Sequence, residues 1–97
     1  MSVKIKDEQW VYVVVQNPDS SEKIVGQFDQ ELGLSYIPVF IEKDSAQMVY
    51  GRLALEKMSK YEIQAILYED VVKHAAENKC LIFILNVDGE ILDKIRP

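Results

Sequence analysis

The sequence contains only one cysteine and one histidine, and it has no long hydrophobic run. A single cysteine, Cys80, excludes an intrachain disulfide and is typical of proteins that work in a reducing compartment. The longest apolar runs, 11–15 and 81–85, are far shorter than the ~20 residues that span a bilayer. The start of the chain is charged, so we expect no signal peptide. These absences predict a cytoplasmic protein without a membrane partner.

Positive charge is also scarce, with 11 Lys and Arg against 16 Asp and Glu and a net charge of −5 at pH 7. No two Lys or Arg residues are adjacent in the sequence. Nucleic-acid binding normally needs a clustered basic face, and an acidic surface repels polyanions. We therefore expect no nucleic-acid partner.

Motifs that carry known chemistry are missing as well. The glycines are isolated, which excludes a phosphate-binding loop, and the sequence has no CxxC, HxxxH or GxSxG pattern. We therefore predict no metal, no cofactor and no catalytic residues. His74 falls on the polar side of a predicted helix, and we interpret it as a solvated residue. Cys80 precedes a buried strand and is interpreted as an apolar filler, although the spacing leaves a Cys80–His74 pair open.

The sequence does contain two linked strand–helix–strand patterns between Leu34 and Val87. This alternation predicts a mostly parallel sheet with helices packed on it. We predict a flexible N-terminal segment, 1–8, followed by a single domain, 9–97. The domain is predicted to be α/β, bordering on α+β. We expect a two-layer sandwich with a mixed sheet of five or six strands and two helices, in the order β-β-β-α-β-α-β-β.

Several local signals refine this prediction. Pro38 lies inside a predicted strand at 34–41. Either the strand should be unpaired on the side of the Pro38 nitrogen, or the strand should bulge there. Gly33 can supply a positive φ, and Asp88-Gly89 predicts a hairpin. A capping box at Asp44 and Gln47 predicts a helix that runs through Gly51 and fades near 57–59. Asn78 is the predicted left-handed residue that ends the second helix. A strand is predicted at 23–28, after a turn at 16–21.

The strands at 10–15 and 81–85 are apolar at every position, so both of their faces must be covered. Right-handed crossovers predict that both helices pack on one face, which leaves the other face open. A homodimer would cover it. Tyr36 and Phe40 share one face of a strand, and aromatic residues are enriched at interfaces, so these two residues form the predicted contact surface.

The segment Ser35-Tyr36-Ile37-Pro38-Val39-Phe40, followed by Ala46, resembles the opening of the SseB-like N-terminal domains, named for an enhanced-serine-sensitivity protein. The segments 66–71 and 82–89 are similar to the later strand, helix and closing strand of that family. The resemblance covers about 23–92 and implies an α/β fold in the bacterial cytoplasm. It implies no catalytic residues. The chain departs from the family at 42–44, where a Thr/Ser-rich helix cap is commoner, and at Asn86-Val87, where Asn-Pro is common.

Two non-enzymatic functions follow as hypotheses, and an enzyme, which would need Cys80 or His74 to lie in a pocket, ranks third. The first is an interaction or regulatory module that acts as a homodimer or binds another protein. The alternative is a small-metabolite sensor, with an amino-acid-like ligand at the carboxyl ends of the parallel strands. Helix N-termini there would lie near the ligand, although their acidic residues disfavour an anion. The residues of this predicted ligand edge are Lys43, Asp44, Glu69 and Asp70.

Overall fold

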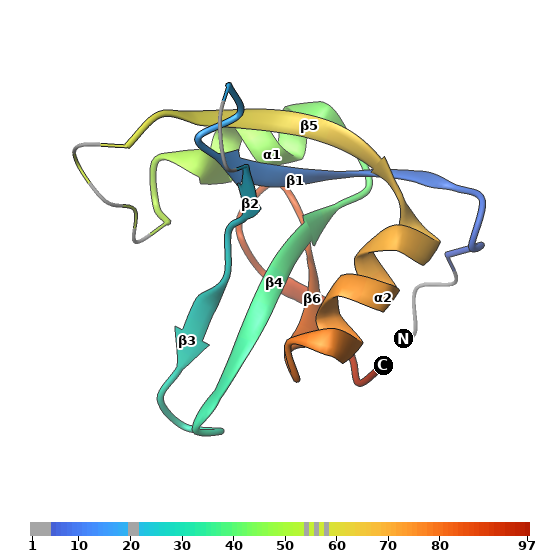
Figure 1. Ribbon diagram of the computed structural model, residues 1–97. Coiled ribbons are helices and arrows are strands. Elements are labelled where there is room, and N and C mark those ends of the chain that lie inside the picture. Colours follow the sequence, from blue (N-terminus) through green and yellow to red (C-terminus); the bar gives the residue numbers. More distant parts are fainter. Residues whose placement is uncertain (1–4, 20–21, 54, 56, 58) are drawn as a thin grey trace.

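The computed structural model describes residues 5–19, 22–53, 55, 57 and 59–97. Strands and helices of these residues form an α/β sandwich around one mixed sheet (Figure 1), as the sequence predicts. The elements are β1 (Trp10–Gln16), β2 (Lys23–Ile24), β3 (Gln27–Asp29), β4 (Leu34–Phe40), α1 (Lys43–Tyr50), β5 (Tyr61–Leu67), α2 (Tyr68–Glu77), β6 (Leu81–Leu85) and β7 (Ile91–Ile95).

The sheet has seven strands rather than the five or six predicted, because the expected strand at 23–28 is divided in two. Its first part, β2, pairs with β1, and its second part, β3, pairs with β4. The connection stays attached to the sheet, since the Val25 N–H donates to the Val14 carbonyl at 2.8 Å. The chain therefore changes partner in the middle of one predicted strand.

The prediction of a mostly parallel sheet is wrong. The strand order is β2-β1-β4-β6-β7, with β5 on β1 and β3 on β4, and only β4 and β6 pair in parallel. The physical reason is the place of β1, which lies between β4 and β5 and runs antiparallel to both. The strands β4, β5 and β6 share one direction, but β5 is separated from β4 by β1.

The two helices pack on opposite faces of the sheet, so the expectation of a shared face is also wrong. Side chains of a strand alternate between faces, and the two buried clusters follow this alternation. Val13, Ile37 and Ile84 pack on the α2 side with Val71 and Ala75 of the helix. The other cluster contains Phe40, Phe83 and Leu85 together with Ala46 and Val49 of α1. All of β6 is buried, which confirms that both of its faces are covered. On each face, a helix of the same chain packs against the sheet.

The sheet turns sharply where β1 meets β4. These strands share one register pair, Tyr12 opposite Phe40, whereas β1 and β5 pair along seven residues each. Figure 1 shows β1 and β5 running steeply across the direction of β4. Pro38 pairs with Phe83 of β6, and it lies between the part of β4 that pairs with β3 and the residue that pairs with β1. The predicted unpaired side at Pro38 is therefore confirmed, and a proline loses no hydrogen bond there.

The first helix is shorter than predicted. It begins after Glu42, which makes no side-chain capping bond, so the predicted capping box at Asp44 is wrong and Asp44 lies within the first turn. The helix ends at Tyr50 with Gly51 as its C-terminal cap, because glycine is a poor helix former. Arg52 then donates through Nη1 to the Asp88 carbonyl at 2.7 Å, which ties this end of α1 to the β6–β7 turn. Ala54, predicted on the apolar face of the helix, lies outside the described residues.

The predicted positive φ of Gly33 and the hairpin at Asp88-Gly89 are confirmed, with φ values of 65° and 80° for the two glycines. Asn86 shapes the hairpin turn, because its Oδ1 accepts the backbone N–H groups of Asp88 and Glu90 at 2.9 Å each. At the other end of the chain, Ile5 packs against the α2-side cluster, and the Asp7 carbonyl accepts the Glu69 N–H at 3.0 Å. Residues 1–4 of the predicted flexible segment lie outside the described residues. None of the described helices is long and apolar enough to cross a membrane.

The second helix ends in a Schellman motif whose left-handed residue is Lys79 and not the predicted Asn78. The Cys80 N–H donates to the Ala75 carbonyl at 2.8 Å, and the Lys79 N–H donates to the Ala76 carbonyl at 3.3 Å. Lys79 has a φ of 55°, a conformation that crowds its Cβ. A glycine at position 79 would adopt the same conformation without this strain.

We predict that Lys79→Gly raises the free energy of unfolding by about 0.5–1 kcal/mol, because glycine relieves the left-handed strain. Lys73→Gly is the matched control, since the same change inside the exposed face of α2 should lower stability by about 1 kcal/mol. Urea unfolding of both variants measures the effect. A loss of stability in Lys79→Gly would contradict the assignment of this cap.

Candidate functional site

The predicted contact pair, Tyr36 and Phe40, lies on the α1 side of the sheet, and its two members differ in burial. Tyr36 is half-buried and stacks on Phe83, with ring centroids 4.1 Å apart and planes 14° apart. Burial raises the pKa of the Tyr36 phenol, and the Asp29 carboxylate raises it further, so the hydroxyl stays neutral at physiological pH. Phe40 is 0% exposed and packs with Ala46 of α1. Contrary to the prediction, Phe40 offers no surface to a partner, because α1 covers it.

The predicted ligand edge is spread over two faces. Lys43 and Asp44 lie in the first turn of α1, and Glu69 and Asp70 lie in the first turn of α2. Since the helices pack on opposite faces, the structure does not bring these exposed residues into one site. A hollow of about 300 Å³ does lie at the carboxyl ends of β4 and β6. Its lining residues are Ile41, Glu42, Ser45, Leu85, Asn86, Val87 and Leu92.

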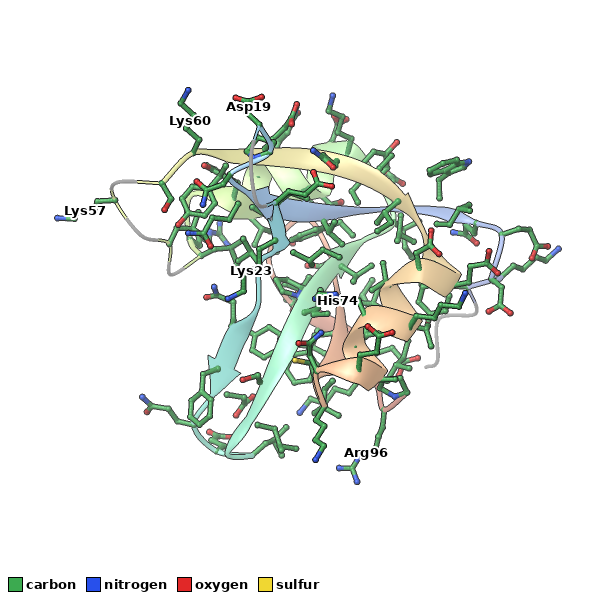
Figure 2. The ribbon with its side chains drawn as sticks, in the orientation of Figure 1. Asp19, Lys23, Lys57, Lys60, His74 and Arg96 are labelled. Carbon is green, nitrogen blue, oxygen red and sulfur yellow. The ribbon has the colours of Figure 1, made fainter. Side chains whose placement is uncertain are left out.

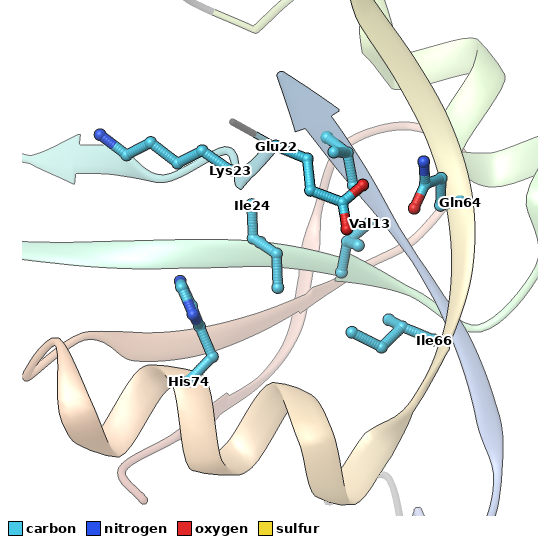
Figure 3. Close-up of a pocket in the computed structure, with 8 residues that line it drawn as sticks. Val13, Glu22, Lys23, Ile24, Gln64, Ile66 and His74 are labelled. Atoms are coloured by element: carbon cyan, nitrogen blue, oxygen red, sulfur yellow. The ribbon is translucent and has the colours of Figure 1, made fainter. Parts of the chain in front are cut away.

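The more enclosed concavity lies on the opposite face, beside α2. Two neighbouring hollows, of about 290 and 390 Å³, share Lys23, Ile24 and His74 in their walls, and we call the pair the α2-side groove. The first hollow is also lined by Val13, Val15, Glu22, Gln64 and Ile66 (Figure 3). The second is also lined by Gly26, Gln27, Phe28, Ser35, Ile37, Asn78 and Cys80.

Strand pairing builds the floor of the first hollow. Val13 lies opposite Gln64, Val15 opposite Ile24, and Val11 opposite Ile66, and residues opposite each other in an antiparallel pair project from the same face. Because β1 has β5 on one side and β2 on the other, it brings side chains from three strands together under α2. The result is an aliphatic floor whose upper rim is polar.

The polar side chains of the rim have defined directions. Figure 3 shows Glu22 and Gln64 projecting into the first hollow from opposite sides of Val13, while Lys23 points away from it along β3. The Gln64 Nε2 donates to Glu62 Oε2 at 3.0 Å, which leaves Gln64 Oε1 as an acceptor. The first hollow therefore presents oxygen acceptors above an aliphatic surface.

His74 is half-buried and lines both hollows, so its interpretation as a solvated residue is wrong. It contacts Asn78, whose Nδ2 donates to the His74 carbonyl at 2.8 Å and lies 3.5 Å from its Nε2. Cys80 also forms a hydrogen bond with Asn78, because its Sγ donates to the Asn78 carbonyl at 3.5 Å. The described contacts of the imidazole and the thiol are thus with Asn78 and not with each other. Both groups occur in the wall of the second hollow.

Basic side chains are dispersed, and metal ligands do not converge within the part of the chain that the structure describes. Figure 2 shows Lys57 and Lys60 at one end of the molecule and Arg96 at the other, with Lys23 and His74 between them. Among the described residues, no group of three His, Cys, Asp or Glu side chains could hold a metal ion. The groove is therefore described by its aliphatic floor and its polar rim.

Comparisons with protein-family models, curated proteins and solved structures gave no match for this chain. The resemblance to SseB-like N-terminal domains therefore stays a prediction.

Sequence reasoning missed the groove, because its residues become neighbours only through the pairing of β1 with β2 and β5. Glu22 is far in the sequence from Gln64 and Ile66, and the three residues share no motif. One signal was available in the helix. His74 directly precedes the buried Ala75 and lies three residues after the buried Val71, which places it on the border of the apolar stripe.

We predict that Phe40→Ala lowers the free energy of unfolding by about 3–5 kcal/mol, because it empties a fully buried site under α1. Phe28→Ala is the matched control, since Phe28 is 62% exposed and its truncation should change stability by about 0.5 kcal/mol or less. Denaturant unfolding followed by fluorescence compares the two variants. Equal losses would show that Phe40 is not covered as the structure describes.

Proposed function

We propose that this chain is a non-catalytic binding module that holds a small metabolite in the α2-side groove. One observation carries the proposal: aliphatic side chains of β1, β2 and β5 form a floor below oriented polar groups. Ligand sites in proteins are typically apolar concavities with a few placed polar groups that fix orientation. The first hollow, at about 290 Å³, suits a molecule of about amino-acid size.

The fold supports a ligand site better than a dimer formed through the sheet faces. The dimer expectation depended on an uncovered apolar face, and each face contains a cluster packed against a helix of the same chain. A sensing role without catalysis fits the contacts of His74 and Cys80, which both bond with Asn78. We place this activity in the bacterial cytoplasm, a proposal supported by the single free cysteine and the family resemblance.

An uncharged aliphatic probe tests whether the groove binds ligands at all. In the wild-type chain, 1-hexanol should shift the backbone amide signals of Val13, Ile24 and His74 in a saturable way. Gln64→Trp should abolish this response, because the indole fills the first hollow from β5. Two-dimensional ¹H–¹⁵N NMR titration of the full chain measures both results.

Glu62→Trp is the matched control for that experiment. Both variants lose the Gln64–Glu62 hydrogen bond, and both residues project from the same face of β5, but Glu62 is absent from the lining of the hollow. Glu62→Trp should therefore bind 1-hexanol like the wild type. Shifts scattered over the whole surface, or none, would contradict the proposed function.

A specific observation also favours the second candidate, a homodimer or protein-interaction module. β7 is an edge strand, and near it Val87, Ile91 and Leu92 are 43%, 44% and 40% exposed. An exposed strand edge can pair with another chain and extend the sheet. A second copy of this chain is the occupant that this candidate names, through antiparallel pairing of β7 with itself.

For this candidate we predict a dimer at micromolar concentration that Leu92→Lys converts to a monomer, because a lysine at the joined edge adds charge to an apolar contact. Leu32→Lys is the control, since Leu32 is similarly exposed, at 46%, but lies in the β3–β4 turn. Light scattering coupled to size exclusion measures the mass of each variant. A wild-type chain that is monomeric throughout this range would refute the dimer.

A further inference from the structure

The first hollow contains one charged group that points into it. Figure 3 shows the Glu22 side chain reaching over Val13 into the hollow, whereas the neighbouring Lys23 extends away. Gln64 Oε1 faces Glu22 across the floor and can accept a hydrogen bond, because the amide nitrogen of Gln64 is held by Glu62. The hollow therefore offers hydrogen-bond acceptors and negative charge to whatever occupies it.

We infer that the ligand of the first hollow carries a primary ammonium group on a short aliphatic body, with Glu22 and Gln64 Oε1 receiving the ammonium. This inference rests on the proposed function and names its ligand class. An ammonium group has three N–H donors, which suits two carboxylate oxygens and one amide oxygen. The aliphatic body would lie on the half-buried side chains of Ile24 and Ile66 below them.

The remaining residues of the hollow favour this ligand over other cations. Quaternary ammonium groups are recognised by aromatic cages, and the described lining of the first hollow contains only aliphatic and polar side chains and the His74 imidazole. A primary ammonium needs hydrogen-bond acceptors instead, and Glu22 and Gln64 supply them.

The charge of the whole chain acts in the same direction. A net charge of −5 raises the local concentration of small cations and lowers that of anions. Lys23 and His74 are the basic residues in the described wall of the hollow, and the Lys23 side chain points toward β3 and away from Glu22. The inference also differs from the predicted ligand edge at Lys43, Asp44, Glu69 and Asp70, which lies at the starts of the helices.

Three probes with the same carbon chain test the inference in the full chain: hexylammonium, 1-hexanol and hexanoate. NMR titration should give the tightest dissociation constant for hexylammonium, with shifts at Val13, Ile24 and Ile66. Glu22→Gln should weaken hexylammonium binding about three- to fivefold, the upper part of the range expected for a solvent-accessible ion pair. It should leave 1-hexanol binding unchanged.

Glu31→Gln is the matched control, because it removes the same charge from the exposed β3–β4 turn and should leave hexylammonium binding unchanged. If 1-hexanol or hexanoate binds as well as or better than hexylammonium, the ammonium inference fails while the binding function stands. An equal loss in Glu22→Gln and Glu31→Gln also overturns it, since only the overall charge would then matter. If none of the three probes binds, the inference and the proposed function fail together.

Discussion

The structure depends on the double pairing of β1, which joins β5 along its whole length but meets β4 only at Tyr12. Full pairing on one side fixes the register of β5 and, through it, the start of α2, whose Tyr68 N–H donates to the Gln9 carbonyl at 2.9 Å. The single pair on the other side lets the sheet turn away. Burial raises the pKa of the Tyr68 phenol, and the charges of Asp93 and Asp7 raise it further, so this hydroxyl stays neutral at physiological pH.

That turn also explains why the α2 face has a groove. The ten-residue α2 packs through Val71 and Ala75 on buried residues of β1, β4 and β6, and the half-buried Ile24 of β2 and Ile66 of β5 line the first hollow beside it. The position of Pro38 fits the same geometry. One side of β4 pairs with β6, but the other side has no partner at Pro38, where a proline N atom has no hydrogen to donate. The groove thus follows from backbone pairing, and its rim follows from which residues flank β1.

The sequence predicted those features that depend on local pattern. Continuous apolar runs located β1 and β6, Gly33 marked the β3–β4 turn, and Gly89 marked the β6–β7 turn. Features that depend on pairing between strands far apart in the sequence could not be predicted from local pattern. Nothing near β5 in the sequence states that it pairs with β1, and the choice of face for α1 and α2 follows from that pairing. The predicted ligand edge assumed neighbouring parallel strands, whereas β1 separates β4 from β5.

Cover for the sheet faces also bears on function. The strongest sequence observation was that the interior strands need cover on both faces, and it suggested a dimer as the source of that cover. Once α1 and α2 each supply cover, the need for a partner at the sheet faces disappears. The half-buried Ile24 and Ile66 line the first hollow beside α2, where Glu22 projects over Val13 and Lys23 points away. An aliphatic surface below a carboxylate favours a ligand with a cationic head and an apolar body.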